Sequence, residues 1–197
     1  MHNPVSNTEK RTTICVFCGS SMGHDEAFGV AARRMGALIA EQGCQLLFGA
    51  GSLGLMGQVA RAARDGGAPV IGILPEFLRH LEPPLKSAEE LIITSDLTER
   101  KDRMMALSDA FVILPGGLGT LDEFFEVATS AQLEVHTKPI VVVNTAGFYD
   151  PLQVMLDHLV AKGFARKEIA ELFHVVATPE EAMKVIQRAL AAAAVSP

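Results

Sequence analysis

Apolar residues along this chain form short continuous runs that alternate with longer stretches in which apolar positions recur every three or four residues. The short runs are typical of buried parallel strands, and the longer stretches are typical of helices that bury one face. The predicted strands are 13–18, 44–48, 69–74, 91–94, 111–114, 139–144 and 173–177. The predicted helices are 27–42, 55–65, 97–108, a helix beginning at Leu121, 150–162 and 179–193.

Strands that alternate with helices at this spacing favour right-handed crossovers and a parallel sheet covered on both faces. The sequence therefore predicts an α/β fold with a Rossmann-like, doubly wound parallel sheet in a single domain, 13–194. A polar lead-in, 1–12, is expected to be disordered. The irregular segment 77–88 could form a loop over a site. In such a sheet, ligands bind beyond the carboxyl ends of the strands, where the direction of the connections switches.

Within the helix expected at 27–42, the apolar residues Val30, Met35, Leu38 and Ile39 are predicted to form the buried face. The helix that begins at Leu121 is predicted to be amphipathic as well.

Charge and composition narrow the possible functions. With 17 basic and 23 acidic residues the net charge is −6, which argues against general binding to nucleic acid or to a membrane surface. No apolar run approaches the roughly 18 residues of a membrane span. The polar N-terminus lacks a signal-peptide apolar region, and three cysteines fit a reducing compartment, so a cytoplasmic location is expected.

The most informative stretch is the glycine-rich turn between the strand 111–114 and the following helix. It places three glycines in four positions, within Pro115-Gly-Gly-Leu-Gly-Thr120. Such a turn lets the backbone approach an anion, and the helix start supplies free N–H groups and a positive dipole end. We therefore predict a phosphate site here. No lysine follows the last glycine, so this is not a Walker loop.

Glu123 allows two interpretations. Thr120 and Glu123 have the spacing of a capping box, in which the glutamate returns to the backbone at the helix start. Alternatively, the carboxylate acts on ribose hydroxyls or on a water molecule beside the phosphate. Glu126 lies one turn further and could share that role. The spacing favours neither interpretation.

A second charged cluster opens the helix 97–108, where Arg100 and Lys101 stand at the end of the helix dipole that disfavours cations. One interpretation is a solvated face with Glu99 and Arg103 paired four residues apart. The other is a contact with an anion or a base. Because nothing in the sequence compensates the basic pair, the second interpretation is favoured.

Two further motifs are weaker. The glycine-rich turn 49–57 resembles a dinucleotide fingerprint but lacks its acidic partner, so it is expected to line the site, with Met56 against a base. Cys15 and Cys18 form a C-x-x-C, but Cys15 lies inside a predicted strand and no second pair or histidine pair accompanies it. We expect core cysteines and no metal site.

Taken together, the motifs resemble the LOG (LONELY GUY) family, which was formerly labelled lysine decarboxylase-like. Its signature, P-G-G-x-G-T-x-x-E, is complete at 115–123, and the resemblance extends over the segments 14–21, 54–57, 131–133 and 147–150. The resemblance implies a phosphoribohydrolase that splits cytokinin nucleoside 5′-monophosphates, and in many members also AMP, into free base and ribose 5-phosphate. It further implies a homodimer with a shared site and no cofactor.

Carried over by position, the resemblance implies two catalytic residues, Arg100 and Glu123. The implied substrate-binding residues are Ser20, Ser21, Gly54, Lys101, Gly116, Gly117, Leu118, Gly119, Thr120 and Thr129. The chain departs from the family at Leu97-Thr98, at Ala50 and at Ser130, and no carboxylate can be assigned within 77–90. Because these departures surround the expected base pocket, the preferred base stays open.

The sequence also allows two other functions to be considered for this fold. A pyridoxal-phosphate decarboxylase needs a lysine that forms a Schiff base, and Lys101 is the only lysine near the proposed site, so this function is disfavoured. The alternative is a non-catalytic nucleotide or molybdenum-cofactor carrier, whose glycine turns this chain resembles. A carrier has no need for both Arg100 and Glu123, and their presence favours an enzyme.

Overall fold

The computed structural model describes residues 11–80 and 89–195, and it contains a parallel sheet of seven strands in the order β4-β3-β2-β1-β5-β6-β7. The strands are β1 (Thr13–Phe17), β2 (Gln45–Phe48), β3 (Val70–Pro75), β4 (Glu90–Thr94), β5 (Ala110–Ile113), β6 (Ile140–Val143) and β7 (His174–Val176). The helices are α1 (Glu26–Glu41), α2 (Gly54–Asp65), α3 (Leu97–Leu107), α4 (Leu118–Gln132), α5 (Asp150–Ala161) and α6 (Pro179–Val195). Short 3₁₀ helices span Glu76–His80 (η1), Thr145–Gly147 (η2) and Lys167–Glu171 (η3).

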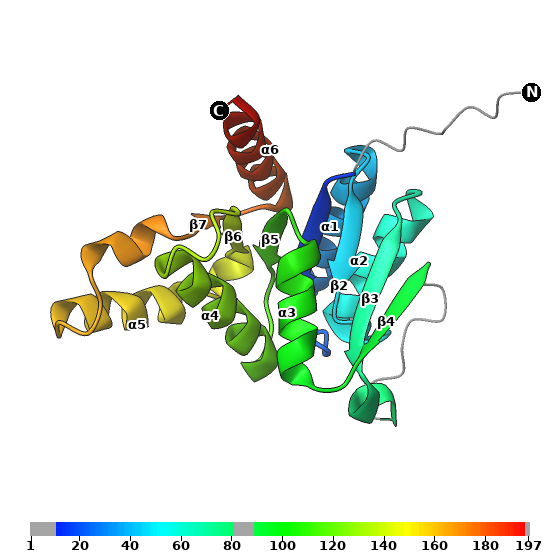
Figure 1. Ribbon diagram of the computed structural model, residues 1–197, viewed down its shortest axis with the longest axis horizontal. Coiled ribbons are helices and arrows are strands. Elements are labelled where there is room, and N and C mark those ends of the chain that lie inside the picture. The colour runs from blue at the N-terminus through cyan, green and yellow to red at the C-terminus, as the bar shows by residue number, and fades with distance from the viewer. Residues whose placement is uncertain (1–10, 81–88, 196–197) are drawn as a thin grey trace, which may run out of the picture.

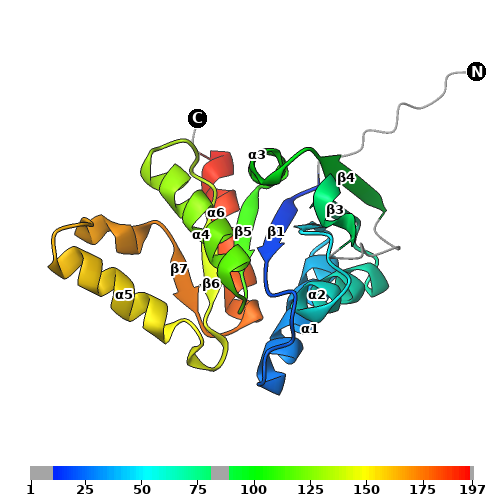
Figure 2. The same ribbon diagram turned by 90° about the horizontal axis from the view of Figure 1, so that it is seen from below.

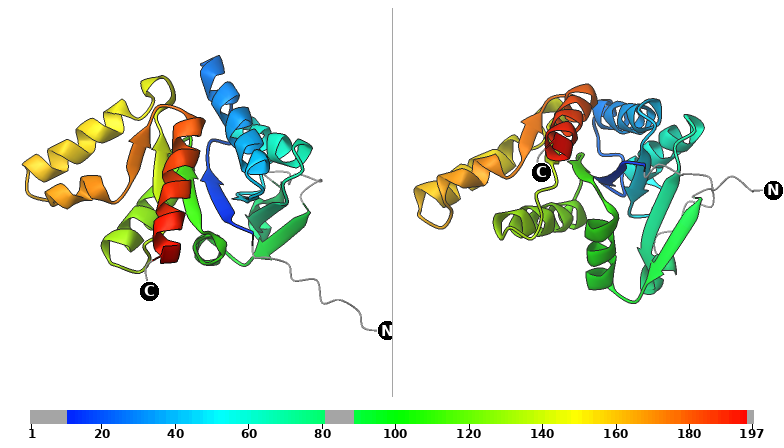
Figure 3. Two further views of the ribbon diagram at one scale, coloured as in Figure 1. Left: turned by 90° about the horizontal axis from the view of Figure 1, so that it is seen from above. Right: turned by 45° about the horizontal axis from the view of Figure 1, so that its top comes forward.

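Helices cover both faces of the sheet. Successive strand residues point to opposite sides, so each strand contributes side chains to two separate cores. In β1, Ile14 and Val16 enter a core under α1, α2 and α6, whereas Cys15 and Phe17 enter a second core that holds residues of α3, α4 and α5. Figure 1 shows the face that α3 and α4 cover, and the left panel of Figure 3 shows α1 and α6 on the other. The predicted doubly wound fold is confirmed.

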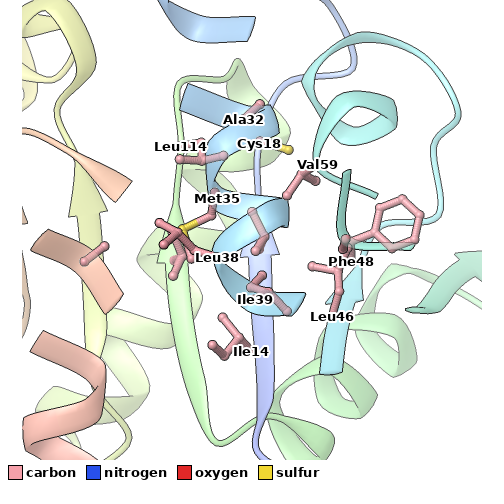
Figure 4. Packing of buried hydrophobic residues seen from close by; sticks show 14 of the residues in the cluster. Ile14, Cys18, Ala32, Met35, Leu38, Ile39, Leu46, Phe48, Val59 and Leu114 are labelled. Carbon is pink, nitrogen blue, oxygen red and sulfur yellow. The ribbon is translucent and has the colours of Figure 1, made fainter. Parts of the chain in front are cut away.

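The packing of α1 confirms most of its predicted buried face and corrects one residue. Met35, Leu38 and Ile39 are buried over the sheet (Figure 4), but the Val30 side chain is 55% exposed. At roughly 100° per residue, Val30 lies about 170° round the helix from the centre of the face formed by the buried residues of α1. The prediction that it belongs to the buried face was therefore wrong.

The predicted bounds of the strands and helices agree with the structure to within a few residues, and the start of α4 is described with the active site below. Two segments cannot be compared. The lead-in 1–10 and the segment 81–88 lie outside the described residues, so the expected disorder and the expected loop over the site are not tested there. The described part of the expected irregular segment, 77–80, lies within the 3₁₀ helix Glu76–His80.

Candidate active site

A crevice is expected where the chain leaves neighbouring strands toward opposite faces, and this happens between β1 and β5. The loop after β1 and the loop after β5 lie side by side there, because the Gly19 amide donates to the Pro115 carbonyl at 3.0 Å. Between them is a cavity of about 200 Å³. Its lining residues are Gly19, Ser21, Met22, Gly23, Phe28, Leu55, Pro115, Gly116, Gly117 and Phe148.

The loop after β5 is anchored by a tyrosine that is not among the predicted site residues. The buried Tyr149 hydroxyl donates to the Leu114 carbonyl at 2.7 Å, and the Tyr149 amide donates to Asn144 Oδ1 at 2.7 Å. Burial raises the pKa of the Tyr149 phenol, so it stays a neutral donor. Position 149 falls in a segment that resembles the family, but nothing local in the sequence indicates this contact.

The start of α4 differs from the prediction and decides one of the open alternatives. The helix begins at Leu118, three residues before the predicted start, with Gly117 as its N-cap in an extended conformation. Thr120 is consequently the third helical residue and not a cap. The capping-box interpretation of Thr120 and Glu123 was therefore wrong.

The first turn of α4 presents free backbone donors toward the crevice. Across residues 11–80 and 89–195, no acceptor meets the amides of Leu118, Gly119 and Thr120, and no side chain caps the helix. Exposed amides at the positive end of a helix form an anion site. The geometry thus suits a phosphate at the predicted turn.

The glycines of this turn serve two different needs. A Cβ on Gly116 would collide with Thr120 Oγ1, so Gly116 permits close packing inside the loop. A Cβ on Gly117 or Gly119 would meet nothing within 4 Å, and neither residue has a positive φ. The fold itself does not require glycine at these two positions. Their missing side chains leave room for a ligand to reach the backbone.

The two predicted catalytic residues meet in a buried ion pair. Arg100 Nη1 lies 2.7 Å from Glu123 Oε1, with the two side chains only 12% and 8% exposed. The Arg100 Nε also donates to the Ile73 carbonyl at the end of β3, at 3.3 Å. Arg100 lies in the first turn of α3 and Glu123 in the second turn of α4. Figure 1 shows these two helices on the same face of the sheet. Glu123 follows the free amides of α4 by about one helical turn on the same helix.

Lys101 joins the same two helices. Its Nζ lies 2.8 Å from Glu126 and 3.3 Å from Asp122, both on α4. The sequence interpretation that the basic pair at 100 and 101 is uncompensated was therefore wrong, because α4 supplies a carboxylate for each cation. The hydrogen bond to Glu126 raises the pKa of Lys101. A lysine held as an ammonium ion is poorly suited to form a Schiff base.

Replacing Lys101 with methionine is expected to weaken the attachment of α3 to α4. We predict a loss of about 1 kcal/mol in the free energy of unfolding, the scale of a partly exposed ion-pair network, measured by urea denaturation. Arg103→Met is the matched control, because Arg103 lies on the same helix and its ion pair with Glu99, at 3.6 Å, is exposed. Unchanged stability combined with a large loss of nucleotide affinity would show instead that Lys101 contacts the ligand.

The other predicted binding residues are placed as follows. Ser20 and Ser21 are exposed in the loop after β1, and Leu118 is 87% exposed beside Gly117 and Gly119. Thr129 is exposed and nine residues beyond Thr120, about 13 Å along the helix, so this chain does not bring it to the turn.

The second glycine turn supports the loop after β1. A Cβ on Gly54, which has φ +57°, would collide with the Ser20 carbonyl group. The amides of Leu55 and Met56 donate to the Gly19 carbonyl at 3.0 and 3.2 Å, so the start of α2 is already occupied. Met56 is buried, with its sulfur close to Gly49 and Gly51, and its contact with a base stays a prediction.

The three cysteines are free and buried, as predicted for core residues. Burial raises the pKa of Cys15 and of Cys18, which keeps both thiols protonated. In the described part of the chain, no three histidine, cysteine, aspartate or glutamate side chains gather as a metal ion would need. None of the helices there combines the length and apolarity that crossing a membrane requires.

Comparison with known proteins shows to which family the chain belongs. A family model described as "possible lysine decarboxylase" matches residues 56–186. A rice protein named probable cytokinin riboside 5′-monophosphate phosphoribohydrolase LOGL1 is 40% identical over 175 residues, covering 89% of this chain and 78% of that protein. Arabidopsis cytokinin riboside 5′-monophosphate phosphoribohydrolase LOG3 is 40% identical over 174 residues, or 88% and 81%. The chain belongs to the LOG family.

A solved structure shares the fold of this LOG-family chain. The molybdenum-cofactor carrier protein of Chlamydomonas reinhardtii superposes with a TM-score of 0.70 at 26% identity, covering 92% of this chain and 99% of that one. The words "lysine decarboxylase" in the description of the family model do not fit the site, because Lys101 is committed to Glu126 and Asp122.

Proposed function

We propose that this LOG-family protein hydrolyses the N-glycosidic bond of cytokinin riboside 5′-monophosphates, releasing the free base and ribose 5-phosphate. The observation that carries the proposal is the buried Arg100–Glu123 pair beside an uncapped helix start. The names of relatives about 40% identical over most of the chain support the same activity.

The 5′-phosphate is held at the start of α4. The amides of Leu118, Gly119 and Thr120 donate to its oxygens, and the positive end of the helix favours its charge. The exposed hydroxyls of Ser20 and Ser21, across the crevice, supply further donors. These contacts predict a preference for a phosphorylated nucleoside over the nucleoside itself.

Glu123 acts on the ribose. It lies five residues after Leu118, about 7.5 Å along the helix, so a ribose attached to the bound phosphate extends toward its carboxylate. As the bond from C1′ to the base nitrogen breaks, its electron pair leaves with the base and positive charge develops at C1′. The Glu123 carboxylate stabilises that charge and takes a proton from the water whose oxygen bonds to C1′.

Arg100 holds Glu123 and faces the leaving base. A guanidinium has five donors and does not give up a proton in proteins, so it acts as a fixed positive charge. Arg100 binds Glu123 through Nη1 and the Ile73 carbonyl through Nε, which orients the group. Its charge stabilises the negative charge that develops on the leaving base, and solvent supplies the proton that the free base gains.

The proposal is tested with a panel of purine and pyrimidine nucleosides and their 5′-monophosphates, including AMP and isopentenyladenosine monophosphate, with products identified by mass spectrometry. We expect base release from monophosphates of cytokinins, with AMP as a further substrate, and little release from the unphosphorylated nucleosides. Nucleotides that all survive unchanged would favour the carrier function, which the structural likeness to the molybdenum-cofactor carrier suggests. We also propose that the protein acts in the cytoplasm.

We further propose that the protein works as a homodimer through the surface formed by α5, η3 and the end of α4. Figure 2 shows α5 and the following segment extending beyond the edge of the sheet. A groove of about 740 Å³ lies between these elements. The exposed fractions of Leu133, Val154 and Phe164 on these segments are 69%, 69% and 86%. Exposed apolar surface of this kind is typical of a protein interface.

Phe164→Glu is expected to convert the dimer into a monomer, because a carboxylate would enter the apolar interface without a partner. Light scattering coupled to size-exclusion chromatography measures the mass directly. Val30→Glu is the control, since Val30 is exposed on the opposite face of the sheet and should leave the dimer intact. A monomeric wild type, or a dimeric Phe164→Glu variant, would contradict the proposed surface.

A further inference from the structure

Gly49, the first residue after β2, lies directly beneath the guanidinium of Arg100. A Cβ built on Gly49 would overlap Arg100 Nη2 and would stand 3.6 Å from Arg100 Cζ. Gly49 itself is buried. The guanidinium therefore occupies the space in which any other residue at position 49 would carry its side chain.

Neither the turn nor a ligand explains the glycine at this position. Gly49 has no positive φ, and the left-handed position of the turn is taken by Ala50, with φ +65°. The start of α2 is not a free anion site either, because the amides of Leu55 and Met56 donate to the carbonyls of Gly19 and Ser21. The three atoms nearest to the missing Cβ are two atoms of the Arg100 guanidinium and the sulfur of the flexible Met56 side chain, at 3.2 Å.

We propose that Gly49 is a positioning residue that seats the Arg100 guanidinium against Glu123. The guanidinium is planar, and its three nitrogens have separate neighbours: Nη1 at Glu123, Nε at the Ile73 carbonyl and Nη2 over Gly49. A methyl group at position 49 pushes Nη2 away. Because the plane is rigid, Nη1 then leaves the Glu123 carboxylate.

The catalytic consequence rests on the proposed function and is measured with a double-mutant cycle of Gly49→Ala and Arg100→Ala. With Arg100 present, Gly49→Ala is expected to lower kcat by about tenfold or more, the scale of a misplaced catalytic group. KM should change by less than about threefold, because the phosphate is held by α4. In the Arg100→Ala background, Gly49→Ala should change kcat by less than about twofold.

Gly51→Ala is the matched control. It lies in the same turn, and the three atoms nearest to its added carbon all belong to the Met56 side chain, with Cε at 2.5 Å. The flexible end of methionine can move aside, so Gly51→Ala should retain the wild-type kcat. Wild-type kcat in Gly49→Ala, or equal losses in the two arginine backgrounds, would overturn the proposal.

Thermal unfolding of the same variants tests whether Gly49 positions the Arg100 guanidinium, and it does not depend on catalysis. We expect Gly49→Ala to lower Tm when Arg100 is present and to leave Tm unchanged when Arg100 is alanine, because the clash has then been removed. This result does not depend on whether any nucleotide in the panel is hydrolysed. A failure of the proposed hydrolytic function is therefore distinguishable from a failure of the proposal that Gly49 positions Arg100. An equal fall of Tm in both backgrounds would show that Gly49 serves the turn itself.

Discussion

Replacing Glu123 with glutamine is expected to lower kcat by about 10³-fold, within the range for removal of a general base and of an electrostatic stabiliser. Glutamine has nearly the same shape and its amide oxygen can still accept from Arg100, so the fold and the start of α4 should be unaffected. It cannot take a proton from water or offset positive charge at C1′. Nucleotide should therefore bind almost as tightly as to the wild type, as measured by calorimetry, while turnover is lost.

The control for this substitution is Glu126→Gln, one helical turn further along α4. Glu126 pairs with Lys101 and is 40% exposed, so its loss should reduce kcat by only a few-fold. Wild-type turnover in Glu123→Gln would contradict the proposed chemistry and leave Glu123 as a structural partner of Arg100. Loss of nucleotide binding together with turnover would mean that Glu123 holds the substrate and does not act on the water.

Removing Arg100 is expected to have two large effects at once. Arg100→Ala should lower the free energy of unfolding by about 3 kcal/mol, because the nearly buried Glu123 charge is left without its partner. It should also lower kcat by about 10²-fold, because the fixed charge facing the leaving base is lost. Chemical denaturation and initial-rate kinetics measure the two effects separately.

Arg103→Ala is the control for Arg100→Ala. The Arg103 side chain is 58% exposed and pairs with Glu99 on the surface, so its loss should cost less than about 0.5 kcal/mol and should leave kcat unchanged. Equal stability losses at 100 and 103 would contradict a buried ion pair at Glu123. A stability loss at 100 without any fall in kcat would confine Arg100 to a structural role.

The sheet could be predicted from the sequence because its inner strands are largely buried on both faces and appear as continuous apolar runs. The edge strands β4 and β7 are more exposed, but they too contain short apolar runs. The start of α4 could not be predicted in the same way. Hydrophobic periodicity detects only the buried face of a helix, and the first residues of α4 bury nothing there: Leu118 is 87% exposed and Gly119 has no side chain. The extended backbone of Gly117 sets the start, and that conformation has no apolar signature.

The site was predictable as a motif but not as a set of contacts. The strand, turn and helix at 110–132 are continuous in the sequence, and the sequence predicts the position of this turn correctly. The ion pair between Arg100 and Glu123, in contrast, joins the helix that precedes β5 in the sequence to the helix that follows it. Those helices meet because α3 and α4 cover the same face of the sheet. The same tertiary packing gives Lys101 its carboxylates and places Gly49 under Arg100. The spacing of residues in the sequence predicts none of these contacts.

The most direct test of the central claim is a product balance with isopentenyladenosine 5′-monophosphate in large excess over the protein, followed by chromatography and mass spectrometry. Hydrolysis at the Arg100–Glu123 pair predicts many turnovers per site, with free base and ribose 5-phosphate appearing in equal amounts and together accounting for the nucleotide lost. Recovery of intact nucleotide, with no more than one equivalent bound per site, would contradict it and identify the protein as a carrier.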